Sequence, residues 1–285
     1  MSRFRPARGS DAVSPTAHYT GEAWVRNGLS HPGLATWQGR ALFDILRPPI
    51  ALSRALGGPT LEGLLLARHR IIDSVLERLI ETREVGQVIE AASGMSPRGW
   101  RFSERYGDRL TYIEGDLPEM ARRKRAALVR MRSLSDTHRV EELDVLREDG
   151  PASLAEVSET LDRDRGLAIV TEGLLTYLDD LAVASIWRRF AAALGEFPTG
   201  CYLADLRLAG PTPGVSERAF NLILSGFVRG GVYPHFADES DAATALKAAG
   251  FREARVHRGD DHAATVDLRD DPGAALIRVV EGRTG

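Results

Sequence analysis

One part of the chain combines small residues and acids in an order that suits a nucleoside. An apolar segment, 87–91, leads into a turn of small residues that contains Gly94, and a second apolar segment, 110–114, ends at Glu114 with Asp116 shortly after it. Small residues let the backbone approach a ligand, and a carboxylate at the tip of the next strand accepts hydrogen bonds from a ribose diol. The order therefore predicts a site for a nucleoside that carries hydroxyl groups.

The turn after the first of these segments is poor in glycine. It reads Glu90-Ala91-Ala92-Ser93-Gly94, whereas a dinucleotide fingerprint, G-x-G-x-x-G, places three glycines to admit a pyrophosphate. Methyltransferases that use S-adenosylmethionine follow a looser rule, an acid followed by x-G-x-G, because their ligand has no phosphate. Glu90 and Gly94 fit this frame, and Ala92 stands where its first glycine would be. The alternative is an ordinary strand–turn–helix unit with a packed small residue.

Four segments, read together, carry a resemblance to one family. They are LLLARHRIID (64–73), VIEAASGMSPRGWRF (88–102), YIEGDLPEMARRKRAAL (112–128) and VTEGLLTYLDD (170–180). In this order and spacing they resemble the leucine carboxyl methyltransferase family, which includes bacterial O-methyltransferases of polyketide and other natural-product pathways. The resemblance runs from about Pro15 to Leu208, and the segment 15–32 favours the bacterial branch. It implies a class I methyltransferase with S-adenosyl-L-methionine as its cofactor.

The resemblance implies two residues that contact the methionine part of the cofactor. Arg68 would pair with the methionine carboxylate, since a guanidinium offers a bidentate fork. Glu172 follows a buried strand and would lie near the amino group and the substrate, because open α/β sheets bind ligands at the carboxyl ends of their strands. The alternatives are a solvated helix arginine and a capping acid. With His69 and Arg70 adjacent, the arginine assignment could also be off by one turn.

The resemblance also implies contacts to the nucleoside part of the cofactor. Asp116 would contact the ribose, and Glu114 could share or take that role. Asp144 and Val145 would lie against the adenine, with the aspartate reaching the exocyclic amine. The alternatives are a helix cap for one of the first two acids and a surface turn for Asp144.

The acceptor side of the predicted site contains fewer assigned residues. Tyr177, Tyr233 and His235 are the predicted pocket residues, and His235 is the best candidate for a general base, although a surface histidine is the alternative. No catalytic residue is assigned. A carboxylate is already ionised near neutral pH, whereas a base would help a phenol or an alcohol. The lack of an obvious base therefore favours methylation of a carboxylate over methylation of a hydroxyl.

The composition is ordinary for a soluble protein. The chain has 285 residues, of which 43% are hydrophobic and 27% charged, and its formal net charge is −3. This charge argues against a nucleic-acid partner, and the basic run 122–125 lacks aromatic residues that could stack on bases. The single cysteine, Cys201, excludes an internal disulfide, and the histidines show no metal spacing. The absence of a long apolar run and of a secretory signal predicts a cytoplasmic protein without a membrane span.

Strand patterns alternate with helix patterns along most of the chain, which predicts a doubly wound α/β fold with a mostly parallel sheet. The predicted strands are 87–91, 110–114, 138–143, 167–171, 200–206, 253–257 and 275–281. The predicted helices between them are 97–106, 118–131, 151–162, 179–194 and 240–249. Seven strands suit the methyltransferase sheet, and the resemblance implies that the last strand is antiparallel.

Two regions fall outside this alternation. Residues 1–84 contain helix patterns and are predicted to form an N-terminal cap on the cofactor-binding domain, 85–285. Residues 209–239 separate two core strands, contain a short predicted helix, 215–227, and are predicted to form a lid at the ligand-binding edge. The cap helices could equally form a contact between two copies of the chain.

Three other functions are compatible with parts of the sequence. A nicotinamide-dependent dehydrogenase would use a similar sheet, but G-x-G-x-x-G is missing. A protein that keeps the fold without methylating is suggested by the small residues that replace glycine in the turn. A pure interaction protein would have no affinity for the cofactor.

Overall fold

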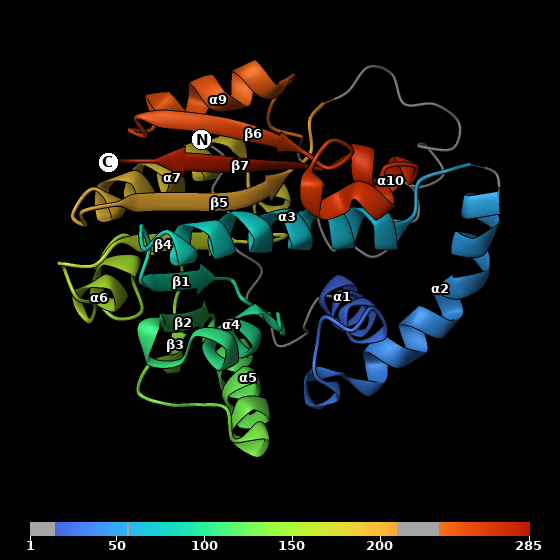
Figure 1. The fold of residues 1–285 in the computed structure, drawn as a ribbon, viewed down its shortest axis with the longest axis horizontal. Helices are drawn as coiled ribbons and strands as arrows, with labels where there is room; N and C mark the ends of the chain where they lie inside the picture. Colours follow the sequence, from blue (N-terminus) through green and yellow to red (C-terminus); the bar gives the residue numbers. More distant parts are fainter. Residues whose placement is uncertain (1–14, 56, 210–233) are drawn as a thin grey trace, which may run out of the picture.

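Residues 15–55, 57–209 and 234–285 are described by a computed structural model (Figure 1). They contain one seven-stranded sheet with the order β3-β2-β1-β4-β5-β7-β6. Its strands are β1 Gln87–Ala91, β2 Thr111–Asp116, β3 His138–Glu142, β4 Leu167–Thr171, β5 Gly200–Leu206, β6 Glu253–Arg258 and β7 Arg278–Arg283. Strand β7 is antiparallel to both of its neighbours, and the other pairs are parallel. The predicted doubly wound α/β sheet is confirmed.

The helices cover both faces of this sheet (Figure 1). They are α1 Pro15–Arg26, α2 Trp37–Ala55, α3 Leu61–Glu81, α4 Arg98–Tyr106, α5 Pro118–Met131, α6 Leu154–Glu159, α7 Asp180–Leu194, α9 Glu239–Ala248 and α10 Pro272–Ala275. Single turns of 3₁₀ helix are η1 Pro32–Leu34, η2 Gly107–Arg109 and η3 Leu175–Tyr177, and η4 spans Ala263–Leu268.

Consecutive residues of the strands enter different cores. Val88 packs with α3 and α4 on one face, and the next residue, Ile89, packs with α6 and α7 on the other. Both side chains are fully buried. Because helices cover both faces, each strand can be apolar throughout, as β1 and β4 largely are. Cys201 is buried in β5 on the first face.

The predicted strands and helices overlap the observed ones. The larger shifts are at the helix predicted at 151–162, which is observed as α6 Leu154–Glu159, and at the last strand. The last strand was expected at 275–281 but begins at Arg278. Helix α10 occupies the preceding residues, since Pro272 suits a first helical turn and Asp271 caps it through a hydrogen bond from Gly273 N.

The predicted cap contains two kinds of helix. Helices α1 and α2 lie beyond the carboxyl ends of the central strands, whereas α3 packs along the sheet itself (Figure 1). The carboxyl ends of β1, β2 and β4 therefore meet at one edge, with α1 beside them. The predicted helix 215–227, most of the predicted lid and Tyr233 lie outside the described residues.

Candidate active site

The turn after β1 meets the end of β2 through a hydrogen bond from a backbone amide to a side-chain carboxylate. Gly94 N donates to Asp116 Oδ2 at 2.7 Å, and Leu117 N donates to the other carboxylate oxygen at 2.8 Å. Burial raises the pKa of Asp116, although these two amide donors act in the opposite direction. The structure thus brings together two of the predicted cofactor residues, Gly94 and Asp116, at the carboxyl edge of the sheet.

The same turn has a strained backbone and a polar atom without a partner. Ala92 has φ 55° and Gly94 has φ 51°, and both values lie in the left-handed region that favours glycine. A Cβ at Gly94 would meet open space. The hydroxyl of Ser93 is buried without a hydrogen-bond partner among the described residues. An open side of the turn and an unsatisfied hydroxyl fit a ligand that approaches this backbone closely.

Glu114 lies deeper than Asp116. Its side chain is fully buried, forms an ion pair with Lys124 and is 2.8 Å from His138 Nε2. Burial alone would raise the pKa of Glu114, but Lys124 and the hydrogen bond with His138 hold it below its usual value. Because both partners come from the protein, the geometry favours Asp116 over Glu114 as the carboxylate that a ribose would contact.

Glu172 follows β4 directly and lies in a cluster of cationic side chains. Arg68 Nε donates to Oε1 at 3.0 Å, and Arg98 Nη2 donates to Oε2 at 2.6 Å. His69 Nδ1 lies 2.9 Å from the same Oε2. Burial alone would raise the pKa of Glu172, but the three neighbours hold it well below the usual range. The carboxylate is therefore ionised at neutral pH.

Arg98 is the central cation of this cluster and is fully buried. Besides Glu172 it binds Asp73 Oδ1 at 2.6 Å and Glu90 Oε1 at 2.6 Å. Glu90, a predicted cofactor residue, also accepts a hydrogen bond from Tyr112 Oη at 2.9 Å. The structure thus places the Glu90 carboxylate inside the protein, where it compensates the guanidinium.

Arg68 joins this cluster to the end of β5. Its Nη1 lies 3.3 Å from Asp205 Oδ2, and Asp205 Oδ1 accepts a hydrogen bond from Gly173 N at 2.6 Å. Gly173 has φ 70°, and a Cβ there would stand 3.2 Å from both Nη atoms of Arg68. Glycine therefore permits the close approach. The Nη2 group makes no hydrogen bond to the described residues, which leaves donors for a ligand.

The charges of the cluster do not balance. Three arginines are paired with four carboxylates, so the formal charge is −1 when His69 is neutral. The members are Arg68, Arg98, Arg101, Asp73, Glu90, Glu172 and Asp205. A bound ammonium group would offset this excess of negative charge.

The remaining predicted residues follow β3 and β4. Asp144 accepts a hydrogen bond from Leu146 N at 3.0 Å, and Val145 is 9% exposed. Both follow β3 within three residues of its end, at the same edge as Asp116. Tyr177 ends η3 and is 38% exposed. These positions are compatible with the predicted contacts to the adenine and the acceptor, which stay predictions.

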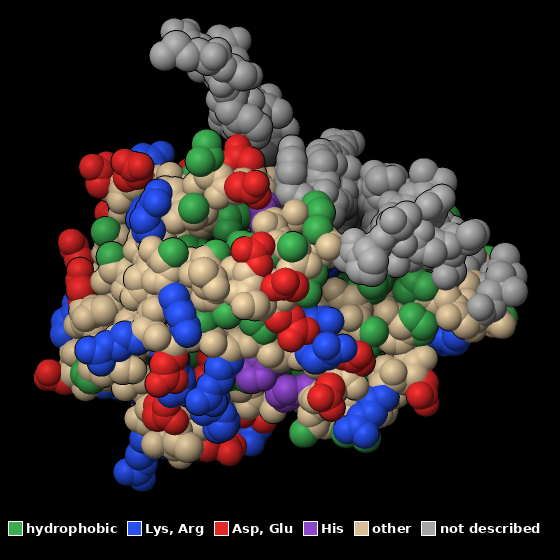
Figure 2. Space-filling view, turned by 90° about the horizontal axis from the view of Figure 1, so that it is seen from above, with side chains coloured by type: hydrophobic (Ala, Val, Ile, Leu, Met, Phe, Trp, Pro, Cys, Tyr) green, Lys and Arg blue, Asp and Glu red, His purple; other side chains and the backbone are tan. Residues whose placement is uncertain are grey.

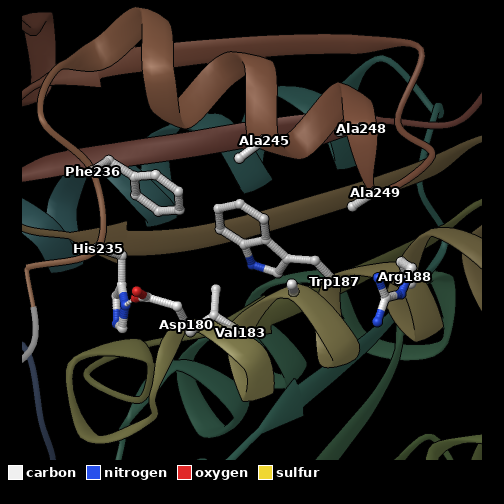
Figure 3. A pocket seen from close by; sticks show the side chains of 10 residues that line it. Asp180, Val183, Trp187, Arg188, His235, Phe236, Ala245, Ala248 and Ala249 are labelled. Carbon is white, nitrogen blue, oxygen red and sulfur yellow. Dashed lines mark hydrogen bonds and ion pairs between the residues drawn. The ribbon is translucent and has the colours of Figure 1, made fainter.

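His235 connects the residues after the predicted lid to the loop after β4. Its Nδ1 is 2.7 Å from Asp180 Oδ1, and its Nε2 is 2.9 Å from Leu175 O. Figure 3 shows this histidine beside Asp180 at one end of a cavity of about 210 Å³ between α7 and α9. Trp187 and Phe236 line the cavity. Both ring nitrogens of His235 already face acceptors, so the ring has a binding role within the protein.

The surface and the other described side chains add three observations. On the face in Figure 2, basic and acidic side chains are interspersed and form no uniformly basic surface. In the parts of the chain that the structure describes, no helix is long and apolar enough to span a membrane. Within the same parts, no group of three or more His, Cys, Asp or Glu residues could hold a metal ion.

Sequence reasoning missed most of the cluster around Arg98. One available signal was Asp205, an acid at the end of the apolar strand GCYLADL, which follows the same positional rule as Glu172. A second was Asp73, which is buried on the apolar face of α3 and lies one turn after His69. No local signal identified Arg98, because its acceptors come from separate elements.

Comparisons with known proteins agree with this geometry. The profile of the leucine carboxyl methyltransferase family matches residues 34–191. An inferred S-adenosyl-L-methionine-dependent methyltransferase from Mycolicibacterium gilvum (strain PYR-GCK) is 31% identical over 130 residues, which are 46% of this chain and 39% of that protein. The chain thus spans well under half the length of this relative.

Solved structures share the fold. An inferred methyltransferase from Thermobifida fusca YX aligns over 95% of both chains with a TM-score of 0.61 at 17% identity. The CMeT domain of the citrinin polyketide synthase aligns over 93% of this chain and 64% of that one, with a TM-score of 0.54 at 14% identity. The family profile and the Mycolicibacterium gilvum relative support the predicted S-adenosylmethionine-dependent methyltransferase class. The chain belongs to the leucine carboxyl methyltransferase family.

Proposed function

We propose that the protein transfers a methyl group from S-adenosyl-L-methionine to an oxygen of a small-molecule acceptor, and that this oxygen belongs to a carboxylate. One observation carries the proposal. Ionised Glu172 and Arg68 lie at the edge of the sheet where Asp116 and the open turn at Gly94 also lie. An anion beside a guanidinium suits the amino and carboxylate groups of a methionine, and the second carboxylate suits a ribose diol.

Different residues would bind different parts of the cofactor. Asp116 would accept hydrogen bonds from the ribose hydroxyls, and Asp144 and Val145 would contact the adenine. Arg68 would use its remaining Nη2 donors for the methionine carboxylate. Glu172 would face the amino group.

The cofactor supplies an activated methyl group on a sulfonium when it is bound. The chain supplies position and exclusion of water, which together account for a large part of such rate enhancements. His235 already has acceptors for both ring nitrogens, so it is poorly placed to remove a proton. A carboxylate acceptor needs no base, because it is ionised near neutral pH.

The acceptor belongs to polyketide or other natural-product metabolism in this proposal, which the bacterial likeness of segment 15–32 supports. A second candidate is a protein that binds the cofactor without transferring the methyl group. The left-handed backbone of Ala92 favours this alternative, since a methyl group stands there where the family motif has glycine.

A methyl-transfer assay with a panel of carboxylic acids and phenols tests the proposal. With cofactor labelled in the methyl carbon, we expect label in base-labile methyl esters. Formation of a methyl ether from a phenol, with no ester from any acid, would show that the acceptor is a hydroxyl and not a carboxylate. Cofactor binding without any labelled product would favour the second candidate.

A further inference from the structure

A second cavity lies in the cap, between α1, α2 and the start of α3. Its volume is about 330 Å³, within the range of small-ligand pockets. We call it the cap pocket. The residues that determine its chemistry are Tyr19, Phe43, Arg47, Ile50, Arg54 and Glu62.

Tyr19 brings an unsatisfied hydroxyl to the cap pocket. The side chain is 3% exposed, and its Oη has no hydrogen-bond partner among the described residues. Burial raises the pKa of Tyr19, so the hydroxyl keeps its proton and can donate. A buried hydroxyl without a partner costs stability, which a ligand acceptor would recover.

The cap pocket also has an uncompensated positive charge. Arg54 pairs with Glu62 at 2.9 Å, so these two charges offset each other. Arg47 makes no ion pair or hydrogen bond to the described residues. The local charge is therefore positive, and an anion is the favoured ligand group.

The rest of the lining is apolar. Phe43 stacks on the Tyr19 ring with centroids 5.4 Å apart and an interplanar angle of 15°. Ile50 continues this surface along α2. An apolar wall next to a guanidinium and a hydroxyl donor suits an organic acid with a hydrocarbon or aromatic body.

The cap pocket lies near the cluster around Glu172. On α3, Glu62 and Arg68 are six residues apart, which corresponds to about 9 Å along the helix axis. On α1, Trp24 packs against His69 with ring centroids 4.8 Å apart, and Tyr19 lies on the same helix. A ligand held at Tyr19 could thus extend toward the cofactor edge.

We propose that the cap pocket binds the carboxylate at one end of an elongated organic acid, whose second oxygen group, at the other end, is the one that is methylated. The claim that the other end is methylated rests on the proposed function, whereas the claim that the cap pocket binds an anion does not. The substrate class is therefore a dicarboxylic acid with an apolar middle. Arg47 and Tyr19 bind the carboxylate that is not methylated.

Calorimetric titration with suberate, octanoate and 1-octanol, without cofactor, tests the anion site. We expect suberate and octanoate to bind and 1-octanol to bind at least tenfold more weakly. Arg47→Gln should weaken octanoate binding about tenfold, because it removes a charged hydrogen-bonding partner. Arg130→Gln, the same charge change at an exposed position of α5, should leave the affinity unchanged.

Tyr19→Phe separates a binding role from a structural one. Removal of an unpartnered buried hydroxyl should keep or raise the melting temperature, while octanoate affinity falls severalfold. A lower melting temperature with unchanged octanoate affinity would overturn the proposal. So would equal binding of octanoate and 1-octanol, unchanged affinity in Arg47→Gln, or no binding of any probe.

A separate titration with S-adenosylmethionine distinguishes the two proposals. Octanoate binding without cofactor binding would refute the proposed function and leave the anion site standing. Cofactor binding without binding of any acid would refute the cap pocket alone.

Discussion

Two buried glutamates on the strands that flank β1, Glu114 of β2 and Glu172 after β4, look alike by charge and burial but differ in position. Glu114 lies within β2, two residues before its end at Asp116, and its carboxylate contacts the fully buried side chains of Lys124 and His138. Glu172 lies directly after β4, and its partner Arg68 retains donors at Nη2. The first arrangement is closed, and the second is open toward the edge where ligands bind.

The difference shows that a buried ion pair is not in itself a sign of function. Such pairs contribute little or even negative net stability compared with apolar packing, but they are costly to break. Position relative to the strand end is the better indicator, because ligands of open α/β sheets bind at that edge. The following predictions test whether the two glutamates truly differ in this way.

The largest effect is expected at Arg98. Arg98→Met would leave Asp73, Glu90 and Glu172 without their shared cation, and we expect the free energy of unfolding to fall by about 3–5 kcal/mol. Urea unfolding measures this change. Arg130→Met, at an exposed position, should change the same quantity by less than about 0.5 kcal/mol. A loss below about 1 kcal/mol for Arg98→Met would mean that the cluster does not depend on this cation.

The next effect is the pH dependence of stability. The folded-state pKa of Glu172 lies below its unfolded value, so its contribution is present above pH of about 4.3 and is lost as pH falls toward the folded pKa. In this window the unfolding free energy should rise by up to about 1.4 kcal/mol per pH unit, and Glu172→Gln should remove that share.

Glu281 is a matched control for this prediction, because it lies in β7, away from the candidate site. Burial acts to raise its pKa, but His257 and Arg283 lower it to about 2. Glu281→Gln should therefore also flatten the pH profile of stability without changing cofactor affinity. An unchanged profile in both variants would contradict the ionised states assigned to these carboxylates.

A third effect concerns the ribose side. Asp116→Asn replaces an anionic acceptor by a neutral one, and we expect affinity for S-adenosylhomocysteine to fall about tenfold. Displacement of a fluorescent adenosine analogue measures this. Asp164→Asn, in an exposed turn, serves as the control and should have no effect. If the two variants had equal affinity for S-adenosylhomocysteine, the ribose would not contact Asp116.

The smallest effect is expected from relief of backbone strain. Ala92→Gly should increase the unfolding free energy by about 1 kcal/mol and tighten cofactor binding, because it removes a left-handed alanine from the turn. Arg83 has φ 62° and lies between α3 and β1, at the amino end of the sheet, so Arg83→Gly should give a similar gain in stability alone. Tighter cofactor binding in both variants, or in neither, would mean that the strain at Ala92 has no specific effect on the cofactor site.

Much of the fold could be predicted from the sequence, because its determinants are local. Apolar runs such as 167–171 and 200–206 matched β4 and β5 to the residue, and Pro118 marked the start of α5. The end of the chain was less predictable, since Ala275 ends α10 and Leu276 caps it, although both are apolar enough for a strand.

The same distinction between local and non-local determinants applies to the candidate site. Asp116 and Glu172 follow from a positional rule about strand ends, which a sequence can express. The partners Arg98, Asp73 and Asp205 depend on contacts between α4, α3 and β5, and a single sequence does not show such contacts. Likewise, Glu114 resembles a ligand residue until the buried Lys124 and His138 beside it are seen.

The most direct test of the central claim is a calorimetric titration of S-adenosylmethionine into the unmodified protein, Glu172→Gln and Glu114→Gln. The account predicts binding by the unmodified protein, a loss of tenfold or more in Glu172→Gln, and a change below about twofold in the folded fraction of Glu114→Gln. Equal losses in the two variants, or a larger loss in Glu114→Gln, would contradict the assignment of the open cluster as the cofactor site.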